Sequence, residues 1–135
     1  MVARHLTMAD VIAAHARAME RLGGQAQSVR DEGLLESAMT RPRMAEYYEG
    51  ADIVRQAALL ATGISQAQAF TDGNKRTALV ATTLFLISNS YEYVCDYLAF
   101  ARQLERVAEA IGERADAESH FEEWLRSCVI TAESA

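Results

Sequence analysis

Residues 74–88 constrain the fold most, because this segment is apolar on almost every side of a helix. After its first turn it reads Ala-Leu-Val-Ala-Thr-Thr-Leu-Phe-Leu-Ile-Ser. A helix that is hydrophobic all round but too short to span a membrane is typical of the centre of a helical bundle. Asn89 is expected to end it in a left-handed conformation. The rest of the chain must then supply helices that cover it.

Five further helices are predicted from apolar residues at helical spacing and from capping residues. Thr7 with Asp10, and Ser119 with Glu122, have the spacing of a capping box. The predicted spans are 7–22, 31–41, 52–67, 96–110 and 119–129. The chain of 135 residues is therefore expected to be all-α and to form a single domain, 1–135, with about six helices and a frayed tail at 131–135.

Breaks between these helices follow from glycine and proline. Gly23-Gly24 and Gly112 are expected to end the first and fifth helices. Pro42 is expected to end the second, because the residue before a proline avoids helical geometry. Residues 43–50 are then predicted to form a loop or short hairpin, and residues 93–95 an extended piece.

Composition favours a cytoplasmic protein that binds neither nucleic acid nor membrane. The formal net charge is −6, and the basic residues form no stripe that could neutralise phosphates. The N-terminus lacks the apolar stretch of a signal peptide. Cys95 and Cys128 lie far apart in the sequence and are expected to be small buried hydrophobes rather than a disulfide. Of the 13 basic residues, Lys75 is the one lysine, which draws attention to its surroundings.

The segment Asp72-Gly73-Asn74-Lys75-Arg76 has the composition of a nucleotide-phosphate cradle. Glycine lets the backbone approach a ligand closely, and the first N–H groups of the following helix attract an anion. The two cations strengthen that attraction, and the aspartate is an oxygen ligand suited to Mg²⁺. The alternative is an ordinary helix start with Asn74 as N-cap and solvated charges beside it. Cations in a first turn oppose the helix dipole, which weakens that alternative.

Residues 70–77, Phe-Thr-Asp-Gly-Asn-Lys-Arg-Thr, resemble the core motif of the Fic/Doc family, H-x-F-x-[D/E]-[G/A]-N-[G/K]-R. Lysine followed by Thr-Ala-Leu resembles the death-on-curing (Doc) branch, and the stretches 30–38 and 84–86 agree with it. The resemblance implies a Fic/Doc helical bundle with its active loop between two central helices. It also implies a toxin of a toxin–antitoxin pair, which transfers a phosphoryl group from Mg²⁺-bound ATP to a threonine of elongation factor Tu and halts translation. Its partner would be a Phd-like antitoxin that folds on binding.

Carried over by position, the motif assigns Asp72 to Mg²⁺ and the residues Gly73, Asn74, Lys75 and Arg76 to the phosphates. The motif histidine, a general base in the family, corresponds to Gln68, and an amide cannot accept the proton. His5, His15 and His120 lie far away in the sequence and are expected to be surface or packing residues.

Three explanations of Gln68 stay open. Catalysis was lost while nucleotide or partner binding was kept, or glutamine is an inactivating substitution in a toxic enzyme, or the glutamine orients a nucleophile that needs little base. Two other functions compete with a kinase-like toxin. One is a non-catalytic binding module, and the other is AMP transfer, which Lys75 and Leu79 disfavour. Tyr47 and Tyr48 fall where the family has its target-docking flap, so they are candidates for target docking.

Overall fold

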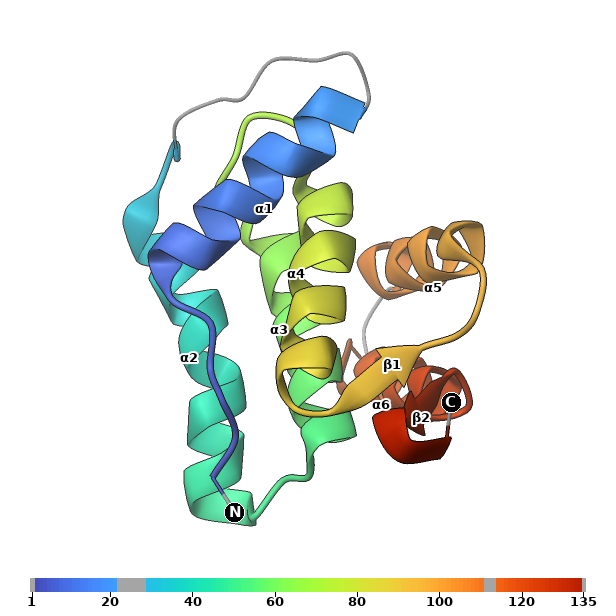
Figure 1. The fold of residues 1–135 in the computed structure, drawn as a ribbon. Coiled ribbons are helices and arrows are strands. Elements are labelled where there is room, and N and C mark those ends of the chain that lie inside the picture. Colours follow the sequence, from blue (N-terminus) through green and yellow to red (C-terminus); the bar gives the residue numbers. More distant parts are fainter. Residues whose placement is uncertain (1, 22–28, 111–113, 135) are drawn as a thin grey trace.

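The computed structural model describes residues 2–21, 29–110 and 114–134, which form six α-helices, two short strands and a terminal 3₁₀ turn (Figure 1). The prediction of a helical bundle is confirmed. The elements are α1 (Met8–Arg21), α2 (Glu32–Glu49), α3 (Ile53–Ala67), α4 (Asn74–Ser88), β1 (Tyr91–Tyr93), α5 (Tyr97–Glu109), α6 (Arg114–Arg126), β2 (Val129–Thr131) and η1 (Ala132–Ser134). The predicted ends at Gly23-Gly24 and Gly112 lie outside the described residues.

Helices α3 and α4 run side by side through the middle of the molecule, with α1 and α2 on one flank and α5 and α6 on the other (Figure 1). Phe85 and Leu86 of α4 are buried against this core, as the apolar pattern predicts. The prediction that α4 is buried all round is wrong on one side. Leu84 and Ile87 are 39% and 60% exposed, because α1 and α5 leave a strip of the helix uncovered.

Side-chain caps set most helix starts where the sequence predicts them. The N–H of Thr7 donates to Asp10 Oδ2 at 2.8 Å, and the N–H of Asp10 donates to Thr7 Oγ1 at 3.1 Å, so the capping box of α1 is confirmed. Asp31, Asp52 and Asp96 cap the next helices by accepting a hydrogen bond from a first-turn N–H group.

The prediction that Pro42 ends α2 is wrong, and so is the loop or hairpin expected at 43–50. The helix continues through Pro42 to Glu49, although a proline has no N–H to donate to the carbonyl of Ala38. That carbonyl faces Gly63 of α3, where an added β-carbon would lie 3.3 Å from the oxygen. Helix α2 packs closely on α3 both before and after the proline, where Ala45 is also buried. This packing keeps the segment helical although Pro42 disfavours a helix.

The C-terminal part corrects three predictions. Cys95 and Cys128 form a disulfide rather than separate buried thiols. Thr131 pairs with β1 in an antiparallel ladder and 132–134 form the 3₁₀ turn, so residues 131–134 of the predicted frayed tail have regular structure, whereas Val129 belongs to β2 and not to the predicted helix. The left-handed residue after α4 is Ser90, with φ +68°, rather than Asn89. The ladder explains the disulfide, because the N–H of Val94 bonds to the carbonyl of Cys128 at 2.8 Å.

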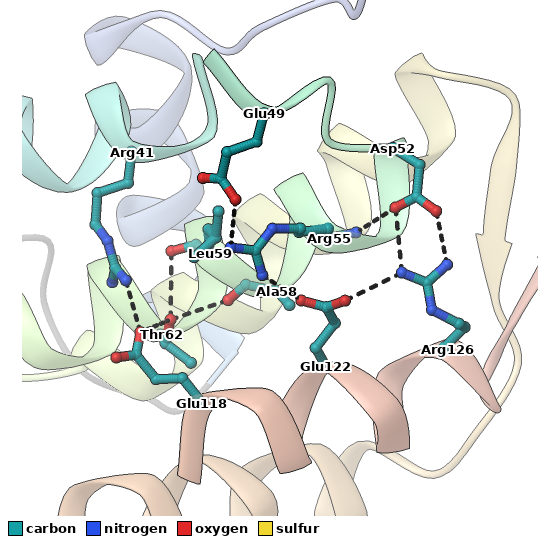
Figure 2. A network of polar contacts seen from close by, with 10 residues as sticks. All are labelled: Arg41, Glu49, Asp52, Arg55, Ala58, Leu59, Thr62, Glu118, Glu122 and Arg126. Atoms are coloured by element: carbon teal, nitrogen blue, oxygen red, sulfur yellow. Dashed lines mark hydrogen bonds and ion pairs between the residues drawn. The ribbon is translucent and has the colours of Figure 1, made fainter. Parts of the chain in front are cut away.

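Helix α6 begins at Arg114, not at the predicted Ser119, and polar contacts fasten it to α2 and α3 (Figure 2). Glu118 pairs with Arg41 at 2.6 Å, and Glu122 pairs with Arg55 at 2.8 Å. Arg126 pairs with Asp52, which caps α3, and the guanidinium holds the pKa of that carboxylate below its usual range. Glu122, which the sequence predicts as part of a capping box, thus links α6 to α3 instead, and Glu118 links α6 to α2. They fix α6 beside α3, one end of which carries the site.

Candidate functional site

A cavity of about 570 Å³ opens where α3 ends and α4 begins. It is lined by every residue that the motif places in the site, namely Gln68, Asp72, Gly73, Asn74, Lys75 and Arg76. The far wall comes from Ala108 of α5 and Arg114 of α6. The structure therefore brings the predicted site residues together and adds a cationic wall from another helix.

Gly73 makes the turn that brings the loop into α4. Its φ of +79° lies in the left-handed region, and it stands at the N-cap, where it has no side chain to accept from the first N–H groups. A β-carbon here would lie 2.7 Å from Met19 Sδ and 3.4 Å from His15 Cε1. The left-handed backbone therefore favours glycine, and an added β-carbon would also force the Met19 side chain to shift.

Asn74 holds the loop closed rather than capping the helix. Its side chain is buried, with Oδ1 accepting from the N–H of Phe70 at 3.2 Å and Nδ2 donating to the carbonyl of Phe70 at 2.9 Å. The alternative in which Asn74 is the N-cap is wrong, because Gly73 occupies that position. The amide clamps the peptide groups of Phe70 and so determines the shape of the loop.

Lys75 and Arg76 place two cations in the first turn of α4. The Nζ of Lys75 lies 3.1 Å from Glu105 Oε1 of α5, and both side chains are close to half exposed. Exposed pairs of this kind contribute about 0.2–1 kcal/mol. A multiply charged anion at the helix N-terminus can therefore compete with Glu105 for the lysine.

Gln68 ends α3 in a left-handed conformation, with φ +54°. Arg30 donates to its carbonyl at 2.6 Å, and its own Nε2 makes a long 3.5 Å contact with the carbonyl of Ser65. A non-glycine residue in this region costs about 1–2 kcal/mol. Its side chain lines the cavity but carries no group that can take up a proton near neutral pH.

Arg114 is the site residue that sequence reasoning missed. Its guanidinium donates to Gln66 Oε1 of α3, and both side chains line the cavity. Its position depends on the docking of α6, so no local pattern in the sequence marks it.

Tyr47 and Tyr48 do not reach this cavity. They are 80% and 72% exposed at the end of α2 that adjoins the start of α3. The loop follows the other end of α3, a helix of 15 residues that spans about 22 Å (Figure 1). The structure therefore separates the two tyrosines from the phosphate cradle.

The histidines have three different settings. His120 is exposed on α6, and His5 bonds to Glu46 Oε1 at 2.8 Å. His15 is fully buried behind the loop, where its Nδ1 lies 3.0 Å from Thr77 Oγ1. Burial lowers the pKa of His15, and the nearby Asp72 carboxylate opposes part of that shift. The expectation of a packing residue is confirmed for His15, but its contacts are with the active loop.

A second cavity, of about 520 Å³, lies between α1 and α4. Leu79, Leu84 and Ile87 supply its apolar floor, and Arg17 and Arg21 stand on its α1 side. We call this the α1–α4 groove. It contains the strip of α4 that the bundle leaves uncovered.

Among the residues that the structure describes, no group of three or more His, Cys, Asp or Glu side chains could hold a metal ion. A divalent cation at Asp72 would therefore need further oxygen ligands from a bound phosphate chain or from water, which is usual for Mg²⁺. No helix in the described ranges is long and apolar enough to cross a membrane.

Comparison with known proteins relates the chain to a family and to a curated protein. Residues 5–86 match the model of the Fic/DOC family. The chain is also 36% identical over 97 residues to Toxin Doc of Mycolicibacterium smegmatis (strain ATCC 700084 / mc(2)155), covering 69% of this chain and 70% of that protein. The family match includes α1 to α3, the loop and most of α4.

Proposed function

This chain belongs to the Fic/Doc family, and from that membership we propose that it is a Doc-type toxin that binds ATP with Mg²⁺. Its ancestral reaction is transfer of the γ-phosphoryl group to a threonine or serine hydroxyl of a translation factor, elongation factor Tu, which halts protein synthesis in the cytoplasm. With Gln68 in place of a base, this chain performs that transfer slowly.

The start of α4 is the observation that supports nucleotide binding most directly. A left-handed glycine leaves the N-cap without a side chain, two cations follow it, and the cavity in front can hold a small molecule. Glu105 compensates Lys75 only through an exposed ion pair, so the two cations of this turn otherwise oppose the helix dipole. A phosphate chain explains both the cations and the missing cap.

The residues fit a magnesium ion that arrives with the nucleotide. Asp72 lines the cavity with its carboxylate, and the remaining ligands would come from the phosphates and water. When bound, the ion neutralises charge that develops on the phosphate oxygens. Lys75, Arg76 and Arg114 would hold and orient the phosphates around it.

Transfer forms a bond between the target hydroxyl oxygen and the γ-phosphorus and breaks the bond from that phosphorus to the β–γ bridging oxygen. ADP leaves, and the hydroxyl proton must go to a base. In this chain the proton passes to water, because the amide of Gln68 cannot accept it. Loss of a general base typically slows such a step by about 10² to 10⁴.

A non-catalytic nucleotide-binding module is the second candidate, and the same residue favours it. Gln68 is held by its backbone bond to Arg30, and it places no basic group in the cavity. AMP transfer is less well supported. Leu79, where the AMP-transferring branch has a second arginine, lines the α1–α4 groove rather than the loop cavity.

We further propose that the partner is an antitoxin segment that folds into a helix in the α1–α4 groove. The groove is apolar along Leu84 and Ile87, and Arg17, Arg21 and Arg76 line it as well. This arrangement suits an amphipathic helix with acidic residues facing the arginines. Charge reversal at Arg17 and Arg21 should weaken capture of such a peptide.

Incubation with elongation factor Tu and labelled ATP tests the proposal. Transfer of the γ-label supports the kinase-like reaction, and transfer of the α-label would instead show AMP transfer. Binding of Mg²⁺–ATP without any transfer, in both this chain and its Gln68→His variant, identifies a binding module. A folded chain that does not bind Mg²⁺–ATP contradicts the nucleotide site itself.

A further inference from the structure

His15 touches the active loop at both of its ends, although it belongs to α1. Its ring stacks on Phe70 with centroids 3.9 Å apart and planes 6° from parallel. Its Nδ1 lies 3.0 Å from Thr77 Oγ1, and its Cε1 lies close to Gly73. The side chain is completely buried, and it does not line the cavity. It therefore cannot replace the missing base.

The hydrogen bonds determine which nitrogen of His15 carries the proton. The single hydroxyl hydrogen of Thr77 is donated to the carbonyl of Gly73 at 2.8 Å. Thr77 Oγ1 must then accept from His15, which makes Nδ1 the protonated nitrogen. Nε2 is left as a bare acceptor, and it has no hydrogen-bond partner among the described residues. The opposite tautomer would bury an unpaired N–H donor, a rarer arrangement in proteins than an unpaired acceptor.

The contacts form a closed circuit around the loop. His15 donates to Thr77, Thr77 donates to Gly73, Asn74 clamps Phe70, and Phe70 stacks back on His15. The hydroxyl of Thr77 connects the two residues, because it accepts a hydrogen bond from the imidazole and donates one to the carbonyl of Gly73. The peptide that follows Gly73 begins the first turn of α4.

We propose that His15 is a positioning residue of the nucleotide site, acting through Thr77 on Gly73 as a neutral imidazole protonated at Nδ1. It sets the direction of the first amide groups of α4 and so the fit of a phosphate chain in front of them. The ligand in this inference rests on the proposed function, whereas the control of loop geometry does not depend on it.

Two substitutions of His15 distinguish the role of its N–H donor from the role of its aromatic ring. His15→Asn keeps an N–H donor near the place of Nδ1 and loses the ring, whereas His15→Phe keeps the ring and loses the donor. We expect His15→Phe to weaken Mg²⁺–ATP binding about tenfold, and His15→Asn to stay within about threefold of the parent chain. Thr77→Val should match His15→Phe, and the double variant should lose no more than either single one.

The readouts are Mg²⁺–ATP affinity by calorimetry and the backbone amide resonances of Gly73, Asn74 and Lys75 without ligand. Leu125→Ala, in α6, is the control for general destabilisation. The inference is overturned if His15→Phe leaves the loop resonances and the affinity unchanged, if His15→Asn loses as much as His15→Phe, or if Leu125→Ala shifts the loop equally. If the parent chain binds no Mg²⁺–ATP, the proposed function fails, and the amide resonances alone still decide the role of His15.

Discussion

Lys75 Nζ of α4 lies 3.1 Å from Glu105 Oε1 of α5, so the lysine that faces the phosphate cavity is already paired with a carboxylate. A phosphate chain that uses Lys75 must compete with this pair. The pair is weak because both partners are close to half exposed.

Glu105→Gln should therefore raise the affinity for Mg²⁺–ATP by up to about fivefold, since an exposed pair is worth about 0.2–1 kcal/mol. Calorimetric titration at low ionic strength measures the change. Glu109→Gln makes the same change in net charge on the same helix and serves as the matched control. Equal gains in both variants would show a general charge effect rather than competition for Lys75.

Gly73→Ala should destabilise the fold by about 2 kcal/mol or more, because it adds a β-carbon at positive φ and against Met19 Sδ. Gly50→Ala isolates the backbone contribution, since Gly50 has φ +65° with nothing within 4 Å of an added β-carbon. Urea unfolding of the two variants gives the comparison. Equal losses would show that contact with α1 does not restrict Gly73.

Gln68→His should increase γ-phosphoryl transfer to elongation factor Tu by about 10² to 10⁴, because it supplies a base at the cavity wall. Gln66→His, which lines the same cavity, is the positional control. Initial rates with γ-labelled ATP measure the effect. A folded, ATP-binding Gln68→His protein with no transfer would contradict the kinase-like assignment.

His15 should make the protein less stable in mild acid. Burial lowers the pKa of His15 below the ordinary histidine value of 6.5, so the unfolded chain takes up a proton at a higher pH than the folded chain does. Stability is then unaffected well above pH 6.5 and falls as the pH drops through that value, until the folded-state pKa is passed. Urea unfolding between about pH 8 and about pH 5 should show this decline. His15→Phe should flatten it, and an unchanged slope would assign the decline to other groups.

Reduction of the Cys95–Cys128 disulfide should lower the free energy of unfolding by about 2–4 kcal/mol, since the bond closes a loop of 33 residues. The active loop lies on other elements, and Arg114 of the cavity wall stands at the end of α6 opposite to Cys128, so Mg²⁺–ATP affinity should stay within about twofold. Thermal melting and calorimetry with and without reductant test both statements. A large loss of affinity on reduction would show that this corner of the fold communicates with the cavity.

Local signals predicted the central part of the fold well. Asp52 caps α3, and the change from loop to apolar helix at Asn74 marks the start of α4, so both spans were predicted correctly. The motif residues line one cavity because they are neighbours in the chain. Boundaries failed where packing decided them, as at Pro42, which leaves the carbonyl of Ala38 without its helical donor but facing Gly63 of the adjoining helix.

Features that depend on distant parts of the chain could not be read in the same way. Cys95 meets Cys128 only because two short strands pair. His15 reaches the loop from α1 and Arg114 reaches the cavity wall from α6, and their sequence neighbours carry no sign of it.

The double hydrogen bond between Asn74 and Phe70 bears on the kinetics of ligand capture. A loop tied through both peptide groups of one residue has already lost its conformational entropy during folding. Binding then carries no ordering penalty for these residues. Association with a small anionic ligand should therefore be a single fast step whose rate rises linearly with ligand concentration, without the plateau that a slow loop closure would impose.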